Sequence, residues 1–177
     1  KSRARVVIAG MGGGTCWGDV KSLWENLKAG KSGIRHIETI PIEHVPVQIG
    51  GEVRGFEPTK YIEHKEARRM GRASQFAVAA ATMATQDAGL TTEMIEAEGE
   101  RVGTVIGTTL GSHEQSEQST TRYKSSGYKK PNPLMLINSL PNMPGHYVSK
   151  FMRTLGPLIA PATACAAGTQ AVGEASE

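Results

Sequence analysis

Short apolar runs alternate with segments of helical spacing along the chain. Three of the runs consist mainly of β-branched and small apolar residues and end at glycine or proline: residues 5–10, 101–107 and 156–161. Continuous apolar runs of this length are typical of strands buried on both faces of a parallel sheet. Because helical patterns separate the three runs, the sequence predicts an α/β fold with a mainly parallel sheet.

The helical segments are marked by apolar residues at a period of 3.6 and by capping residues. The first helix is expected between Asp19, a suitable N-cap, and Gly30, which would stop it. The longest is expected over residues 66–88, with a charged start and an almost wholly apolar second half. Residues 31–64 contain three prolines and are expected to be irregular, with a short strand near 47–53. Further helices are expected near 91–94, 112–123, 140–153 and 165–175.

Composition and charge exclude several classes of protein. Of the 177 residues, 38% are hydrophobic and 21% are charged, which excludes a disordered chain, and no apolar run is long enough to span a membrane. The net charge of +3 is too small and too dispersed to indicate nucleic-acid binding. The apolar run after the basic N-terminus is too short for a signal peptide, so we expect a cytoplasmic protein. Its two cysteines, Cys16 and Cys165, have neither metal-ligand spacing nor the pattern of a disulfide framework.

A glycine-rich segment follows the first predicted strand. Its four glycines are Gly10, Gly12, Gly13 and Gly14. A glycine-rich turn between a strand and a helix is typical of dinucleotide-binding proteins. The match is incomplete, because Thr15 stands where the last glycine of that fingerprint is expected and the helix begins several residues late. We expect these glycines to serve the exit of a strand, and a nucleotide-binding module is the alternative.

Cys165 stands where the last predicted strand gives way to a helix. The unpaired N–H groups at a helix N-terminus stabilise a thiolate, and they can hold the oxygen of a thioester as it becomes an oxyanion. Small residues surround the sulfur, namely Ala164, Ala166, Ala167 and Gly168. They leave room for another group to approach it, which indicates a nucleophile. The alternative is a buried structural cysteine that packs like a small hydrophobic residue.

Three motifs in combination carry a resemblance to a known family. Residues 163–168 read TACAAG, residues 142–146 read NMPGH and residues 156–157 read GP. With these motifs the chain closely resembles the β-ketoacyl-acyl-carrier-protein synthases of type II, along its whole length from residue 5. The resemblance implies a thiolase-like fold with α/β/α/β/α layers, a homodimer, and decarboxylative Claisen condensation in fatty-acid elongation. A polyketide ketosynthase and a noncatalytic ketosynthase-like subunit are the alternatives within this family.

The resemblance also implies roles for individual residues. Cys165 would accept an acyl group as a thioester, and its backbone N–H would form part of the oxyanion hole. The acyl pocket would be lined by Leu110, Ala164, Leu134, Met135 and Leu136. Leucine at position 110 and methionine at position 135 depart from the β-branched and aromatic residues more usual in the family, so the preferred chain length stays open. Ordinary core packing is the alternative interpretation of these apolar residues.

Five basic residues match family positions that contact the acidic acyl carrier protein. They are Lys65, Arg68 and Arg69, at the start of the longest predicted helix, and Lys129 and Lys130, in a loop. Such groups steer an acidic partner. Cations at a helix start oppose the helix dipole, which suggests a role beyond folding, and a solvated charged face is the alternative. The substrates would travel on the phosphopantetheine arm of the carrier, and no other cofactor and no metal is implied.

The resemblance also implies that residues 1–177 are the N-terminal half of a ketosynthase domain, since the family is built from two similar halves. It places the two histidines that serve malonyl decarboxylation in the second half, and none of the five histidines here matches them. His146 is expected to be structural within a packed helix, and Cys16 to be a buried thiol beside Trp17. We therefore expect residues 1–177 alone to be inactive, and the small apolar helix at 165–175 to need cover on all sides.

Overall fold

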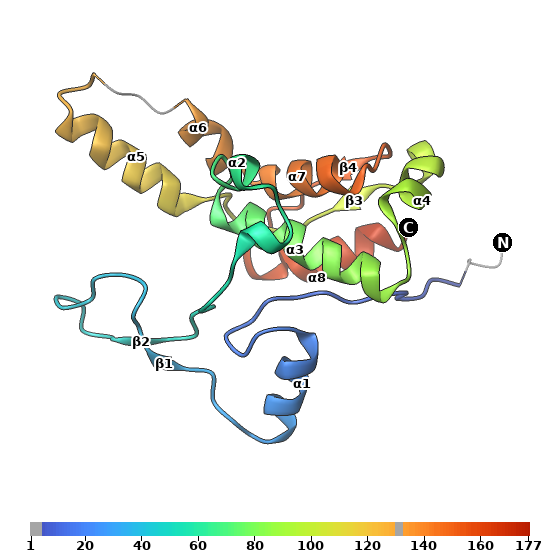
Figure 1. Cartoon of the computed structure of the whole chain (residues 1–177), viewed down its shortest axis with the longest axis horizontal. Helices are drawn as coiled ribbons and strands as arrows, with labels where there is room; N and C mark the ends of the chain where they lie inside the picture. The colour runs from blue at the N-terminus through green and yellow to red at the C-terminus, as the bar shows by residue number, and fades with distance from the viewer. Residues whose placement is uncertain (1–4, 130–132) are drawn as a thin grey trace.

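The computed structural model describes residues 5–129 and 133–177. In chain order its elements are α1 Val20–Lys28, β1 Arg35–His36, β2 Ile49–Gly50, η1 Pro58–Lys60, α2 His64–Ala67, α3 Arg72–Asp87, α4 Thr92–Ala97, η2 Gly99–Arg101, β3 Thr104–Val105, α5 His113–Ser125, α6 Leu134–Ser139, α7 Met143–Met152, β4 Leu158–Ile159, η3 Ala164–Ala166 and α8 Ala167–Ala175. Helices α3, α7 and α8 surround the strand pair of β3 and β4, and two arms extend from this body (Figure 1). None of the described helices combines the length and apolar character that crossing a membrane requires.

Two of the three predicted parallel strands pair with each other. In β3 and β4, Thr104 lies opposite Leu158, and the pairing is parallel. Its hydrogen bonds continue beyond the strands, because the N–H of Thr108 donates to the carbonyl of Pro161 at 3.1 Å. The segments that follow the two strands, 106–111 and 160–166, therefore leave the pair at the same end. This end is where Cys165 lies.

The predicted strand at residues 5–10 is not formed. This segment is extended but pairs with no strand among the described residues, and its apolar side chains are exposed, Ile8 by 80%. Its glycines place it against α3 instead: a Cβ on Gly10 or Gly12 would collide with a carbonyl oxygen of that helix. The prediction was wrong because an apolar run becomes a strand only where a neighbouring strand offers hydrogen bonds. Residues 5–10 have no strand partner among the described residues, and they pack closely against α3.

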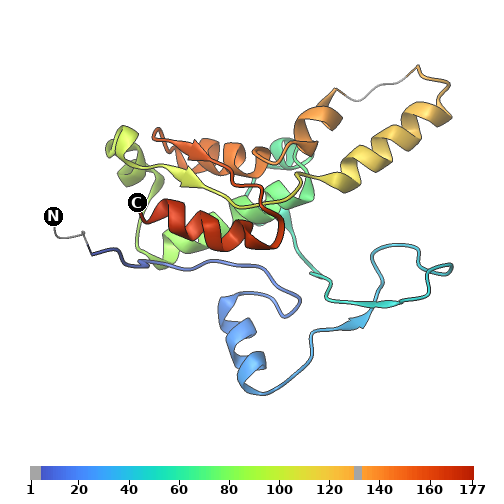
Figure 2. The ribbon, with the colours of Figure 1, turned by 180° about the vertical axis from the view of Figure 1, so that it is seen from behind.

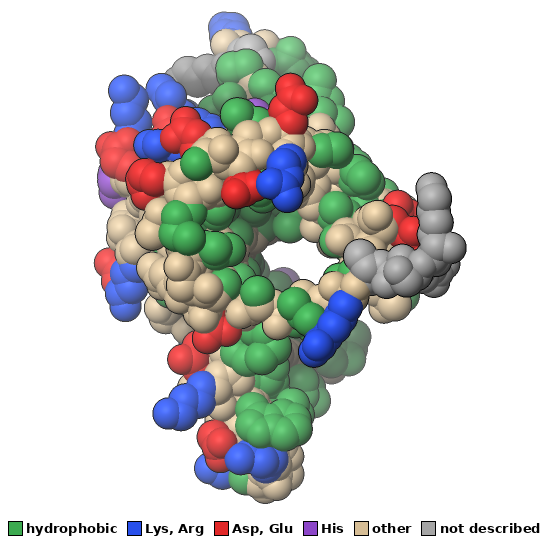
Figure 3. All heavy atoms as spheres, turned by 90° about the vertical axis from the view of Figure 1, so that its right-hand side faces the viewer, with side chains coloured by type: hydrophobic (Ala, Val, Ile, Leu, Met, Phe, Trp, Pro, Cys, Tyr) green, Lys and Arg blue, Asp and Glu red, His purple; other side chains and the backbone are tan. Residues whose placement is uncertain are grey.

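Helix α1 forms where the sequence predicts it. The carboxylate of Asp19 accepts a hydrogen bond from the N–H of Ser22 at 2.8 Å, and Gly30 follows the helix with a φ of 63°. The apolar stripe of α1 is not covered, since none of its residues is buried and Trp24 is 60% exposed. Figure 3, which shows the right-hand side of the view in Figure 1, also has hydrophobic side chains at the surface.

The long helix predicted over residues 66–88 is divided into α2 and α3. Gly71 lies between them in an extended conformation and caps the N-terminus of α3. A Cβ at this position would collide with the hydroxyl of Ser112, so the break allows the start of α5 to approach the corner between α2 and α3. The division was not predicted because Gly71 alone, within an otherwise helical pattern, is a weak signal.

The core lies between α3 and α7 and includes the segment before α3. Its buried members are Ile62, Ala67, Met70, Val78, Met143, Tyr147, Val148 and Met152. Helix α7 was predicted over 140–153 and contributes half of this cluster. Because α7 connects directly to β4, this core fixes the strand pair that leads to Cys165.

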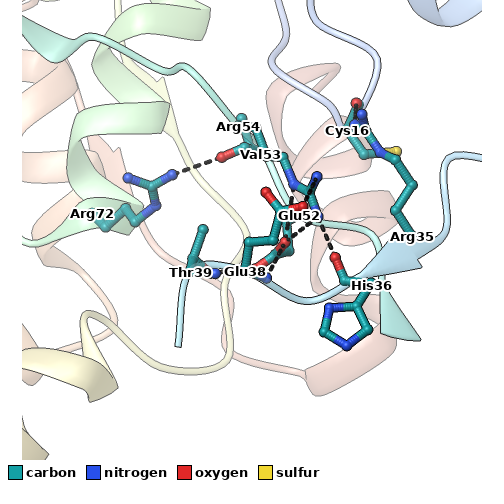
Figure 4. A network of polar contacts seen from close by, with 9 residues as sticks. All are labelled: Cys16, Arg35, His36, Glu38, Thr39, Glu52, Val53, Arg54 and Arg72. Carbon is teal, nitrogen blue, oxygen red and sulfur yellow. Dashed lines mark hydrogen bonds and ion pairs between the residues drawn. The ribbon is translucent and has the colours of Figure 1, made fainter. Parts of the chain in front are cut away.

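One arm carries the antiparallel pair of β1 and β2, in which Arg35 lies opposite Gly50. It confirms the short strand predicted near residues 47–53. The carboxylate of Glu52 accepts hydrogen bonds from the backbone N–H of Glu38 and of Thr39, from the hydroxyl of Thr39 and from the guanidinium of Arg54 (Figure 4). The Thr39 hydroxyl and these further donors lower the pKa of Glu52 to about 2.

The β1 and β2 arm is also tied to the body. Arg72, at the start of α3, donates to the carbonyl of Val53 at 3.0 Å (Figure 4). Its guanidinium also lies 4.7 Å from the ring centroid of Phe76. Arg35 donates to the carbonyl of Cys16 at 2.7 Å. The arm is thus held by polar contacts at both of its ends.

The second arm consists of α5 and α6, which lie side by side and extend from the body (Figures 1 and 2). Helix α5 was predicted, and none of its residues is buried. Helix α6 was not predicted, since residues 134–139 are too few to display a helical period. Its Asn138 is 1% exposed and anchors the arm to the body.

Candidate active site

Cys165 lies in a tight turn between β4 and α8, as predicted. The turn is the short helix η3, and α8 itself begins two residues later, at Ala167. Ala164, directly before the cysteine, has a φ of 53°, a left-handed conformation that a residue with a Cβ rarely adopts. The thiol side chain is exposed. A strained turn that presents one nucleophilic side chain to solvent is typical of catalytic nucleophiles in α/β enzymes.

The end of β3 supports this turn. A Cβ on Gly107 would collide with the carbonyl oxygen of Ala167, so only glycine allows the strand to approach the first turn of α8 so closely. The hydroxyl of Thr163 donates to the side-chain oxygen of Gln170 at 2.8 Å, which joins the residues on either side of Cys165. The backbone around the sulfur is therefore held by the contact of Gly107 with Ala167 and by the hydrogen bond between Thr163 and Gln170.

Helix α8 is only partly covered. Only Ala167 and Ala171 are buried, and Val172 is 67% exposed. This agrees with the expectation that the helix needs cover which residues 1–177 do not supply. Among the described elements, α8 packs mainly against β3 and η3.

Leu110 lies between two close approaches of the backbone. Gly107 contacts α8, and a Cβ on Gly111 would collide with the carbonyl oxygens of Asn138 and Leu140, at the end of α6. The side chain of Leu110 is 56% exposed. Leu110 therefore has no place in the core of the described residues.

The remaining apolar candidates are divided between two places. Ala164 adjoins Cys165 in the turn, whereas Leu134, Met135 and Leu136 lie on α6, in the arm and away from α8 (Figures 1 and 2). Leu134 and Met135 are half-buried and Leu136 is exposed. The structure therefore does not bring the three α6 residues to Cys165 within this chain.

The basic residues Lys65, Arg68 and Arg69 are all exposed and lie together around the end of α2. They do not share the start of one long helix, as predicted, because that helix is divided at Gly71: Lys65 is the second residue of the four-residue α2, Arg68 is its C-cap and Arg69 follows. The dipole of so short a helix gives no separate reason for their presence. Lys129 is exposed, and Lys130 lies outside the described residues.

Glu66 lies among these cations and is itself paired. Its carboxylate is 2.5 Å from the ammonium of Lys150, on α7, and 3.7 Å from the guanidinium of Arg69. Lys150 lowers the pKa of Glu66 by hydrogen bonding and by its charge. The pairing neutralises the acidic residue, so the exposed charge of this corner is positive.

Two other sequence-based expectations are met in part. Cys16 lies beside Trp17 and packs with it against Gly33, as expected, but it is half-buried rather than buried. His146 belongs to a packed helix, as expected, but it is exposed on α7, with its ring edge against Tyr147. The sequence analysis did not identify Gln115 and Asn138, which join α5 and α6 to the corner between α2 and α3. Single polar residues in polar segments, or in segments with no predicted element, give no sequence signal.

The glycine-rich segment is not the exit of a strand, as predicted, because residues 5–10 form no strand. Gly10 and Gly12 are used for packing against α3. Gly13 and Gly14 line a cavity of about 170 Å³ whose charged residues are of both signs: Asp19, Glu57, Arg54 and Lys60. This volume is below the roughly 300 Å³ of ordinary ligand pockets. The arrangement does not favour the nucleotide-binding alternative.

Comparisons with known proteins agree with the geometry. Residues 3–177 match the family described as Beta-ketoacyl synthase, N-terminal domain. The 3-oxoacyl-[acyl-carrier-protein] synthase 2 of Staphylococcus aureus (strain COL) is 38% identical over 172 residues, which cover 97% of this chain and 41% of that protein. The protein of the same name from Synechocystis sp. is 33% identical over 174 residues, covering 98% of this chain and 41% of that protein.

Solved structures show the same fold. The ishigamide ketosynthase/chain length factor aligns with a TM-score of 0.81 at 29% identity and covers 98% of this chain and 43% of its own. A Beta-ketoacyl synthase from Burkholderia phymatum STM815 aligns with a TM-score of 0.80 at 29% identity, covering 97% and 42%. The chain spans about two fifths of the length of these relatives. Their similarity confirms the predicted thiolase-like α/β fold, and the chain belongs to the β-ketoacyl synthase family, whose N-terminal domain it matches.

Proposed function

We propose that the protein carrying this chain is a β-ketoacyl-acyl-carrier-protein synthase in which Cys165 is the nucleophile. The observation that carries the proposal is the position of Cys165 in a strained turn between a parallel strand and a helix. Two relatives that are at least 33% identical carry the name 3-oxoacyl-[acyl-carrier-protein] synthase 2, which supports the same activity. The sequence identity favours fatty-acid elongation over the polyketide alternative.

The reaction has two steps. The Cys165 thiolate attacks the carbonyl carbon of an acyl thioester, and the carrier thiol leaves, so that the acyl group is held on the cysteine. Malonyl-carrier protein then loses carbon dioxide, and the resulting carbanion attacks the acyl carbonyl. A carbon–carbon bond forms, the bond to the Cys165 sulfur breaks, and the thiolate is regenerated. The backbone N–H of Cys165 donates to the oxyanion in both steps, and loss of one such donor typically costs roughly 10²-fold in rate.

The acyl chain would extend past Ala164 and Leu110. Both residues adjoin the turn of Cys165 or the loop that contacts α8, and the exposed side chain of Leu110 can move without disturbing a core. Leu134, Met135 and Leu136 lie on the projecting α6, where they would line the pocket of a second copy in a homodimer. This arrangement gives the arm of α5 and α6 a function that its distance from Cys165 would otherwise leave unexplained.

The acidic carrier protein would approach the basic corner around α2. Lys65, Arg68 and Arg69 supply exposed positive charge there, and Lys129, which follows α5 in the arm, is exposed as well. Lys130 lies outside the described residues and stays a candidate for the same partner. Charges of this kind raise the rate of encounter with an oppositely charged partner and orient it. The substrates are delivered on the phosphopantetheine of the carrier, so the proposal requires no further cofactor and no metal.

The proposal is tested by the intact mass of the protein, as its cell makes it, after incubation with an acyl-carrier thioester. We expect the mass to rise by one acyl group, and the gain to be absent in Cys165→Ala. Cys16→Ala is the matched control, because its thiol is half-buried between Trp17 and Gly33 and should not be acylated. A gain that persists in Cys165→Ala, or one that is lost in Cys16→Ala alone, contradicts the assignment.

A further inference from the structure

Part-buried polar contacts join the corner between α2 and α3 to the arm of α5 and α6. The side-chain amide of Asn138 donates to the carbonyl of Arg69 at 2.8 Å and to the side-chain oxygen of Gln115 at 2.6 Å. The amide of Gln115 donates in turn to the carbonyl of Met70 at 2.9 Å. Two side chains of the arm therefore bind two successive carbonyl groups of the corner.

The same arm satisfies the other side of the corner. The carboxylate of Glu114 accepts a hydrogen bond from the N–H of Arg72 at 3.1 Å, and Gly71 leaves room for the buried Ser112. Ser112 is itself fixed, because its N–H donates to the carbonyl of Asn138 at 2.7 Å. The end of α2 leaves carbonyl groups unpaired and the start of α3 leaves N–H groups unpaired. Gln115 and Asn138 pair with the carbonyl groups, and Glu114 pairs with an N–H group.

The backbone that these contacts hold carries exposed arginines. Arg68 and Arg69 belong to the corner, and their side chains are exposed. On the opposite side of α2, the ion pair of Glu66 with Lys150 ties the helix to α7. The corner is thus fixed from the α5 and α6 side by hydrogen bonds and from the α7 side by charge.

We infer that Gln115 and Asn138 are positioning residues that orient Arg68 and Arg69 for the acidic carrier protein. The inference rests on the proposed function and deepens it by naming what holds the docking surface. Loss of the Gln115 amide leaves the Met70 carbonyl and one N–H of Asn138 unpaired, so the corner is free to leave its bound conformation. A surface that must be ordered on binding has a lower affinity than one that is already ordered.

The contacts also make the corner and α6 parts of one unit. Asn138 belongs to α6, the helix that carries Leu134, Met135 and Leu136. A carrier bound at Arg69 is therefore connected through a single side chain to the helix that we propose lines the acyl pocket of the second copy. The same hydrogen bonds of Asn138 would therefore align the carrier-binding surface with the residues of α6 that line the pocket.

The test is the Kd of the carrier protein for the intact protein, measured by titration for the wild type, Gln115→Ala and Gln118→Ala. Gln118 is the matched control, since it has the same side chain on the same helix but is exposed. We expect Gln115→Ala to raise Kd by about 3- to 10-fold and Gln118→Ala to leave it unchanged. In steady-state assays, KM for acyl-carrier should rise equally, while KM for an acyl-pantetheine without carrier should stay constant.

A double-mutant cycle with Arg69→Ala separates positioning from general damage. If Gln115 acts through the corner, Gln115→Ala should raise Kd much less in the Arg69→Ala background than in the wild type. Gln115→Met, which keeps the volume but neither donates nor accepts, should reproduce the effect even if Gln115→Ala folds poorly. An unchanged Kd in Gln115→Met, or fully additive effects in the cycle, overturns the inference. A wild type that binds carrier but does not condense acyl groups contradicts the proposed function alone.

Discussion

A Cβ on Gly107, two residues beyond β3, would collide with the carbonyl oxygen of Ala167, at the start of α8. The contact sets the distance between the strand pair and the helix that follows Cys165. Because the obstacle is backbone, it cannot turn aside as a flexible side chain would. The position of Cys165 therefore depends on a glycine, a residue with no Cβ, at position 107.

Gly107→Ala should displace the first turn of α8. Overpacking of this kind typically destabilises a protein by about 1–3 kcal/mol, and the displaced Cys165 should react at least roughly tenfold more slowly with an acyl-carrier thioester. The rate is measured by the time course of the mass gain. Gly173→Ala, in the same helix but with open space around it, is the control and should leave the rate unchanged. Equal rates for both variants would contradict the proposed role of the contact.

The left-handed conformation of Ala164 predicts opposite responses to two substitutions. Ala164→Gly removes the clash of the Cβ and should change the free energy of unfolding by less than about 1 kcal/mol, since relief of strain offsets the added freedom of the unfolded chain. Ala164→Val places a β-branched residue in this conformation and should destabilise the protein by about 1–3 kcal/mol. Denaturant titration measures both values. A valine variant as stable as the glycine variant would show that the turn does not keep this conformation.

The basic corner should respond to charge reversal and to salt. Arg68→Glu is expected to slow association with the carrier protein, and the difference from the wild type should shrink as ionic strength rises, because salt screens exposed charges. Lys31→Glu makes the same change of charge at an exposed residue outside the corner and serves as the control. Association rates from stopped-flow mixing at several salt concentrations test this. Equal slowing by both substitutions would indicate an effect of net charge rather than of the corner.

Glu52 should make the β1 and β2 arm sensitive to acid. Its pKa is about 2 in the folded chain and about 4.5 ordinarily, so the folded arm favours the ionised form. Its contribution is therefore fully present above pH 4.5 and is lost as the pH falls from 4.5 toward 2. We expect the amides of Glu38 and Thr39 to be protected from hydrogen exchange at pH 5 and to lose protection through this range. In Glu52→Gln, the protection of both amides should be low and nearly independent of pH.

The sequence predicted those elements whose signals are local. The N-cap Asp19, the stop at Gly30 and the paired runs at 101–107 and 156–161 act through nearby residues or through each other, and all appear in the structure. Cys165 could be located because a strand, small residues and a helix follow one another directly in sequence. The family resemblance then added what the local pattern could not, namely the roles of dispersed residues.

The failures concern contacts between distant segments. Residues 5–10 have the composition of a strand, but the close fit of Gly10 and Gly12 to α3 determines their place. The break at Gly71 depends on Ser112, which is 41 residues away in sequence. Asn138 has no distinctive neighbours, yet it joins two helices to the basic corner. Periodicity describes which face of an element is apolar, and it carries no information about which partner that face or a lone polar residue will meet.

The most direct measurement of the central claim is product formation by the protein as its cell makes it, supplied with an acyl-carrier thioester and malonyl-carrier protein. The wild type should release carbon dioxide and form a β-ketoacyl thioester two carbons longer than the acyl substrate, and Cys165→Ala should form none. Cys16→Ala should retain the wild-type rate. Formation of the elongated thioester by Cys165→Ala at the wild-type rate would contradict the assignment of Cys165 as the nucleophile.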